Sequence, residues 1–174
     1  MRFKQVGNKN DILSVVVKSA ETTSTIAAGN PVALVMNGTN DGLAVVLPAT
    51  ATAAKAHSLA FGVAHNPISP AAYGETQVWG FCQRAKYSRI RTRANSTTAY
   101  ASTAAVAVGD ILNIDTVQNG FQPAGAQAVT AYLPAAVVAE TLASLDSVAT
   151  SDISLSTATV SYSTGFMKVF LRMM

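Results

Sequence analysis

Five cations within ten positions are the residues of this chain whose types and spacing best suit a binding role. They are Arg84, Lys86, Arg89, Arg91 and Arg93. Because alternate side chains of an extended strand point to the same face, the last three would form one row of guanidinium groups, shared by Tyr87. No acidic residue lies between Glu75 and Asp110 to neutralise the row. We take the five cations as candidate partner-binding residues.

Three interpretations of this basic segment stay open. It could be a solvated edge strand whose charges discourage strand-to-strand aggregation. It could dock onto an acidic partner surface, since guanidinium forks pair well with carboxylates. It could bind nucleic acid, because five charges can hold phosphates, but no recognised RNA or DNA motif accompanies them. Nucleic acid is therefore the least favoured partner of the three.

The other chemistry-bearing residues form no recognisable catalytic or metal-binding set. His57 and His65 are the only histidines and Cys82 is the only cysteine, and their spacing is not that of metal ligands. Asp110 and Asp115 lack the acid-rich loop spacing of a calcium site, and Asp110 has an ordinary role as a turn residue. The sequence has neither a nucleophile elbow nor a glycine-rich phosphate loop. We expect no enzyme, cofactor or metal, and a buried, inert Cys82 thiol.

The composition favours a neutral protein that packs against partners. Of its 174 residues 49% are apolar and only 12% are charged, with a net charge of +3. A surface with so few charges is better suited to burial against other proteins than to exposure on a free monomer. The N-terminus lacks the uninterrupted apolar core of a signal peptide, and the uncharged stretches are too polar to be good membrane-spanning helices. We expect no membrane partner.

Short runs of Val, Ile, Leu and aromatic residues alternate with Gly, Asn, Asp and Pro, which predicts a mainly β chain of short antiparallel strands with little helix. Asn37–Gly42 and Asn119-Gly120 are hairpin signals. Ala49–Ala56 and Ala139–Leu145 are weak helical candidates. The predicted strands are Ile12–Lys18, Val32–Met36, Leu43–Leu47, Leu59–Ala64, Thr76–Cys82, Ile111–Asp115, Ala136–Val138, Thr159–Tyr162 and Phe166–Arg172. We expect Trp79 and Phe81, together with Tyr73, to belong to the core.

A faint internal repeat leaves open whether the chain forms one barrel or two. Gly29-Asn30-Pro31-Val32 resembles Gly109-Asp110-Ile111-Leu112, and in both copies a small-residue strand and an aromatic closing strand follow. The corresponding division is an N-terminal strand or arm over residues 1–26 and a first β module over 27–93. Residues 94–174 would be a second module or the completion of the same barrel.

The order of these features resembles the capsid decoration, or cement, proteins of tailed bacteriophages. The resemblance is carried by Ala28–Val35, by Phe61–Ala64, and by Ala72-Tyr73-Gly74 through Val78-Trp79-Gly80-Phe81, and it covers roughly residues 28–115. It implies a β-barrel or β-tulip-like module, often a homotrimer. Such a module attaches where subunits of the major capsid protein meet.

On this resemblance, we expect a virion structural protein that stabilises the capsid surface and passes through the host cytoplasm during assembly. Another virion component, such as a fibre-base or tube subunit, is an alternative. A carbohydrate-binding or adhesin module is another alternative and would require exposed aromatic residues. A nucleic-acid binder relying on the basic segment is a further one.

Overall fold

The computed structural model describes residues 3–5, 12–36, 44–51, 60–93, 107–116, 118–123, 136–139, 149–155 and 158–172. Within these ranges the chain forms eleven strands and no helix, which confirms the mainly β prediction. The strands are β1 (Phe3–Gln5), β2 (Leu13–Ser19), β3 (Pro31–Leu34), β4 (Ala44–Val46), β5 (Ala60–Ala64), β6 (Tyr73–Arg93), β7 (Ile111–Asp115), β8 (Gly120–Pro123), β9 (Ala136–Val138), β10 (Ala149–Leu155) and β11 (Ala158–Arg172).

Five of the strands close into a β-barrel. Their order is β2-β4-β3-β5-β6, and an additional pairing of β2 with β6 closes the ring. The β2–β4 pair is parallel, and the other four pairs are antiparallel. Closure leaves none of these five strands as an open edge within the ring.

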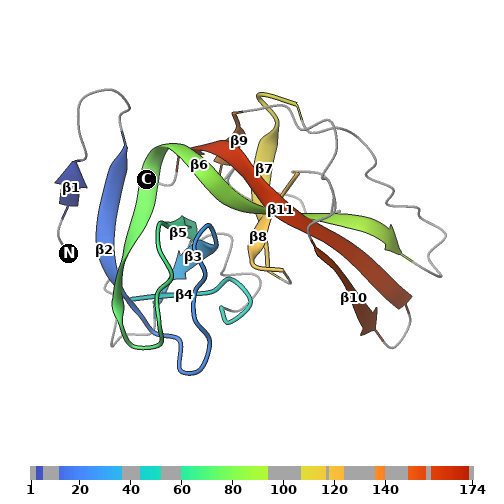
Figure 1. The fold of residues 1–174 in the computed structure, drawn as a ribbon, viewed down its shortest axis with the longest axis horizontal. Coiled ribbons are helices and arrows are strands. Elements are labelled where there is room, and N and C mark those ends of the chain that lie inside the picture. Colours follow the sequence, from blue (N-terminus) through green and yellow to red (C-terminus); the bar gives the residue numbers. More distant parts are fainter. Residues whose placement is uncertain are drawn as a thin grey trace.

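A second ring of five strands repeats this arrangement. Its order is β6-β8-β7-β9-β11, and it closes through the pairing of β11 with β6. The parallel pair is now β6–β8, and the other four are again antiparallel. Strand β6 therefore ends the first ring and begins the second, and Figure 1 shows it as one green ribbon running from one ring into the other. Beyond the second ring, β10 pairs with the start of β11.

The two rings share a pattern of backbone hydrogen bonds as well as a topology. The backbone N–H of Gly29 donates to Ala64 O at 2.8 Å, and that of Gly109 donates to Val138 O at 3.0 Å. In the same two places, Ala64 N–H donates to Asn30 O at 3.0 Å and Val138 N–H donates to Asp110 O at 2.9 Å. Both glycines have positive φ, 87° and 94°. The chain is an internally duplicated β unit, as its sequence repeat indicated.

The pairings cut across the division drawn from the sequence. Strand β2 lies within residues 1–26, yet it is a member of the first ring. Strand β6 ends at Arg93, at the boundary drawn between the modules, but it belongs to both rings. Two units that share a strand in this way have no linker between them at β6.

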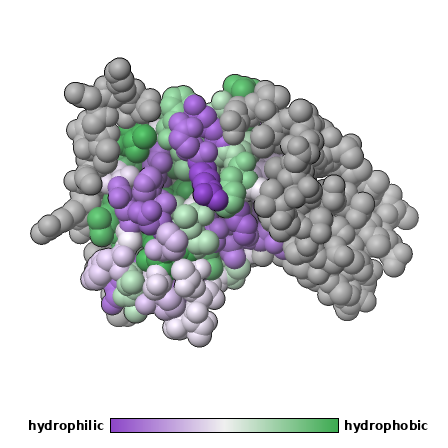
Figure 2. Space-filling view, viewed as in Figure 1, coloured by the Kyte–Doolittle hydropathy of each residue, from purple (hydrophilic) through white to green (hydrophobic). Residues whose placement is uncertain are grey.

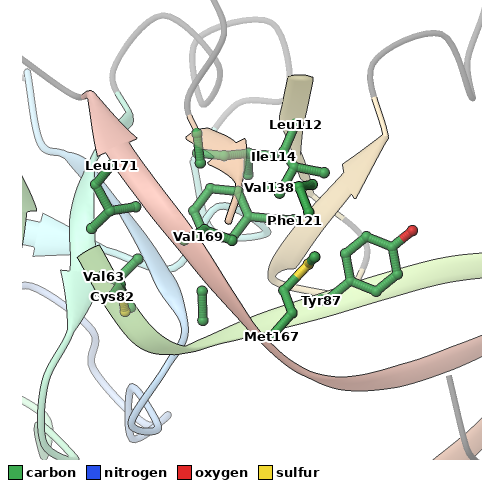
Figure 3. Close-up of a cluster of buried hydrophobic side chains, with 12 residues drawn as sticks. Val63, Cys82, Tyr87, Leu112, Ile114, Phe121, Val138, Met167, Val169 and Leu171 are labelled. Atoms are coloured by element: carbon green, nitrogen blue, oxygen red, sulfur yellow. The ribbon is translucent and has the colours of Figure 1, made fainter. Parts of the chain in front are cut away.

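Each ring has its own hydrophobic core. The first is built mainly from Val, Ile and Leu side chains, among them Val15, Val17, Val32 and Val45. The second is larger and includes Tyr87 and Phe121, both with no exposed surface. Figure 3 shows this second core, with Met167, Val169 and Leu171 of β11 projecting inward. Strand β2 of the first ring and β6 of the second are equivalent, since each is the first strand in the order of its ring.

Most of the predicted strands are confirmed, with two differences. The segment Thr76–Cys82 is only part of the 21-residue β6, and the two C-terminal strands are one continuous β11. Strands β1, β8 and β10 were not predicted. The hairpin at Asn119-Gly120 is confirmed, with φ 52° at Asn119 between β7 and β8. The hairpin Asn37–Gly42 and most of both helical candidates lie outside the described residues.

The duplicated glycine turns give a matched pair of stability predictions. Gly109→Ala should lower the free energy of unfolding by roughly 1–2 kcal/mol through its positive φ. No steric cost is added, because a Cβ there would meet nothing within 4 Å. Gly29→Ala should cost roughly 1–3 kcal/mol more, because its Cβ would lie 2.7 Å from Arg84 O and 2.8 Å from Phe166 Cε1. Urea unfolding followed by circular dichroism measures both. Equal costs would contradict the close approach of the Gly29 turn to β6 and β11.

Candidate functional site

The outer surface where β6 and β11 pair carries an unusual set of side chains. Phe81 lies opposite Phe170, and Trp79 lies opposite Arg172. On β11, Met167, Val169 and Leu171 are buried, while the alternate residues Phe166, Lys168 and Phe170 lie on the outer face and are exposed or partly exposed. We call the outward set the waist strip, because it lies where the two rings meet: Trp79, Phe81, Arg84, Phe166, Lys168 and Phe170.

Aromatic rings of the waist strip pack against one another on the outside of the barrels. The ring of Phe170 contacts Trp79 at 5.5 Å and Phe81 at 5.1 Å between centroids, and both pairs are edge-to-face with an interplanar angle of 74°. Such pairs contribute about 0.5–1.5 kcal/mol each beyond their burial. Phe81 and Phe166 remain 42% and 41% exposed. Large rings held in place yet exposed to this degree are typical of binding surfaces.

The expectation that Trp79, Phe81 and Tyr73 form the core was wrong. Tyr73 is 73% exposed and Phe81 is 42% exposed, while Trp79 is half-buried. Alternation predicts two faces of a strand but does not say which one is inside. Here Val78 and Cys82 occupy the interior together with Gly80, whose φ is 91°. Along this part of β6 the inward side chains are small, and the aromatic rings of Trp79 and Phe81 lie outside.

Two cations complete the waist strip by lying over its rings. The guanidinium carbon of Arg84 is 4.2 Å from the centroid of Phe166, and Lys168 Nζ is 5.3 Å from that of Phe81. Exposed contacts of this kind contribute about 0.5–1 kcal/mol and restrict the side chain. A bulge in β6 makes the first contact possible, since the register skips from Cys82 to Ala85 and leaves Gln83 and Arg84 both exposed.

Of the five candidate cations, Lys86 has a largely internal role. It is half-buried, and Lys86 Nζ donates to Gln118 O at 2.6 Å. Burial lowers the pKa of Lys86, and the nearby carboxylate of Asp115 opposes that shift. Buried Asp115 also accepts a hydrogen bond of 2.5 Å from Ser88 Oγ. These contacts join β6 to the β7–β8 hairpin, so Lys86 stabilises the second ring.

The remaining three cations lie further along β6, next to β11. Arg89 is opposite Ser163 and Arg93 is opposite Val160, and the register skips Arg91. Their side chains lie outside what the structure describes. The expected row of guanidinium groups therefore stays a prediction, and only Arg84 of the five is placed on an exposed surface with a described contact.

Among the residues considered for catalysis or metal binding, those that the structure describes do not form a shared site. His65 is exposed, Cys82 is buried, and Asp110 Oδ2 accepts a hydrogen bond of 2.8 Å from Ala107 N–H, which is the turn role expected of it. His57 lies outside the described residues. In the described part of the chain, no three His, Cys, Asp or Glu side chains are placed to share a metal ion. Nor does that part contain a helix able to cross a membrane.

Reasoning from the sequence missed the waist strip as a whole. Its two halves come from residues 79–84 and 166–170, which are far apart in the chain and meet only through the β6–β11 pairing. The alternation of Phe166, Lys168 and Phe170 was a usable signal, but nothing local indicated their neighbours. In comparisons with known proteins, no family model, curated protein or solved structure matches this chain.

Cys82 gives a direct check on the interior of the second ring. Burial raises the pKa of its thiol from the ordinary 9.0, opposed by a weaker effect of a backbone hydrogen bond at Arg84. Because the thiolate is the reactive form and the native thiol is also shielded, reaction with an aromatic disulfide reagent at pH 8 should be slow. We expect the rate to be on the order of 100-fold lower in buffer than in urea. Equal rates would show that Cys82 is accessible.

Proposed function

We propose that this protein is a non-enzymatic virion component that binds the outer surface of a capsid and stabilises the shell by bridging neighbouring subunits. The observation that carries the proposal is the waist strip, an exposed set of aromatic and cationic side chains held on two fused barrels. Interfaces are enriched in aromatic residues and arginine, and their energetic centres are rings held in fixed positions. The low charge of the chain, 12% of residues, also suits extensive burial against protein.

The proposed mechanism is burial of surface rather than catalysis. Each protomer would contact the major capsid protein, and a homotrimer would present several copies of the same surface at once. Linked contacts raise the overall avidity without new chemistry, provided that the geometry allows them to form together. Rigid closed rings suit this role, because little conformational entropy is lost when they bind.

A carbohydrate-binding or adhesin module is a second candidate, and the exposure of Tyr73, Phe81 and Phe166 favours it. The ring geometry of the waist strip argues against a sugar platform. Trp79 and Phe81 each meet Phe170 edge-to-face at 74°, so these rings do not lie in one plane. A fibre-base or tube subunit is distinguished by its partner, since it would not bind shells.

Purified protein and empty, undecorated shells provide the test. Light scattering should give a mass three times the 18.0 kDa of the chain. The protein should co-sediment with shells and raise the temperature at which they rupture. High salt should weaken that binding only partly, because apolar burial persists when charges are screened. A monomer that stays in the supernatant would refute the proposal, and retention on immobilised glycans would favour the second candidate.

A further inference from the structure

We infer that the waist strip binds an acidic protein segment that also carries apolar side chains, and that Arg84, positioned by Phe166, makes the central carboxylate contact. The inference deepens the proposed function and relies on it only for the partner's identity as a capsid protein. The chemistry of the segment follows from the strip itself. Its rings offer apolar contact, and its cations offer charge-assisted hydrogen bonds to carboxylates.

The charge of the waist strip is of one sign. Neither the stretch from Trp79 to Lys86 nor that from Phe166 to Phe170 contains an acidic residue, while the two contain Arg84, Lys86 and Lys168. Among the acids whose side chains are described, Glu21 and Asp115 are buried, Asp110 belongs to a turn of the second ring, and Glu75 lies opposite Val16 in the first ring. A partner that covers the exposed guanidinium of Arg84 should therefore supply negative charge, so that this cation is not buried without compensation.

The duplication allows one cation of the waist strip, Lys168, to be compared with its equivalent in the first ring. His65 N–H donates to Glu75 O and Ala139 N–H donates to Lys168 O, which places Glu75 and Lys168 at equivalent positions of the two rings. Tyr73, opposite Lys18, is likewise the equivalent of Phe166, opposite Lys86.

The first ring thus keeps the exposed aromatic and the lysine opposite it, but has an acid where the second ring has Lys168. Both rings close with the same pairings. A lysine at the position of Lys168 is therefore not a requirement of barrel closure.

Ring geometry favours a protein segment over nucleic acid. Bases bind best to open, roughly parallel aromatic faces. Arg84 covers one face of Phe166 at 4.2 Å, and Phe170 meets both Trp79 and Phe81 edge-to-face. The guanidinium instead lies over the Phe166 ring, and this contact restricts its rotamers while N–H groups of the exposed Arg84 can donate to a carboxylate. Figure 2 shows hydrophilic and hydrophobic residues interspersed on one face of the described part of the molecule.

The test uses fluorescent eight-residue probes and the intact protein. One peptide alternates Glu and Leu, a matched peptide alternates Lys and Leu, and the third probe is single-stranded oligothymidylate. Arg84→Glu reverses the proposed contact. Lys18→Glu is the matched control, because it makes a like change of charge at an exposed residue of the first ring. Arg84→Gln replaces Arg84→Glu if the latter does not fold, as judged by circular dichroism.

The Glu-Leu peptide should bind wild type at least about tenfold more tightly than either other probe. Arg84→Glu or Arg84→Gln should weaken it about tenfold or more, and Lys18→Glu should leave it unchanged. The inference is overturned if no Glu-Leu binding is seen at millimolar peptide, if another probe binds as tightly, or if the Arg84 variants bind like wild type.

Shell sedimentation of the same variants separates the two claims. If wild type and the Arg84 variants bind shells alike, the proposed function stands and the waist strip is not its contact. If the Glu-Leu peptide binds in an Arg84-dependent way but shells do not bind, the strip is a binding surface for acidic segments and the capsid role fails.

Discussion

Closure of two barrels on a single strand is the constraint on which the rest of this structure depends. Strand β6 is 21 residues long, and its hydrogen bonds complete the first ring with β2 and β5 and the second with β8 and β11. A strand has only two edges, so β6 serves both rings by pairing with different strands along its length, and Val78 belongs to the first core while Cys82 belongs to the second.

A bulge at Gln83 and Arg84 shifts the phase of β6 within the second ring, because Cys82 before it and Ala85 and Tyr87 after it all belong to the second core. Before it, Val78 and Cys82 are buried, and after it Ala85 and Tyr87 are. The phase of burial therefore shifts by one residue, as a β-bulge requires. The same bulge turns Arg84 outward onto Phe166. The bulge therefore helps to build the waist strip.

The turn at Gly29 in the first ring contacts β6 and β11 near the bulge. Gly29 O accepts a hydrogen bond of 2.8 Å from Lys86 N–H, and the turn approaches both Arg84 and Phe166 closely. Asn119 of the second ring accepts a hydrogen bond of 2.8 Å from Ala49 N–H in the loop after β4. The rings are therefore linked through side contacts as well as through β6, which supports a rigid relation between them.

The sequence predicted much of the fold because turn chemistry and β periodicity are local. Ile111–Asp115 and Ala136–Val138 have the predicted bounds, and the repeated Gly-Asx turns reported a real duplication. The single run of β6 was not predictable, because Gly80 and the basic residues after Cys82 resemble the end of a strand. Which face of β6 points inward near Trp79 and Phe81 depends on the closure of the rings by distant strands. No local sequence pattern encodes that closure.

Native-state hydrogen exchange tests the sharing of β6 most directly. Ile114 has no exposed surface in the second core, and Ile114→Val should remove about 1 kcal/mol of stability there. If the two rings open as one unit, the slowest amides of the first ring, such as those of Val15 and Val17, should lose the same free energy of opening as those of the second. Loss confined to the second ring would show two barrels that unfold separately and would contradict the account.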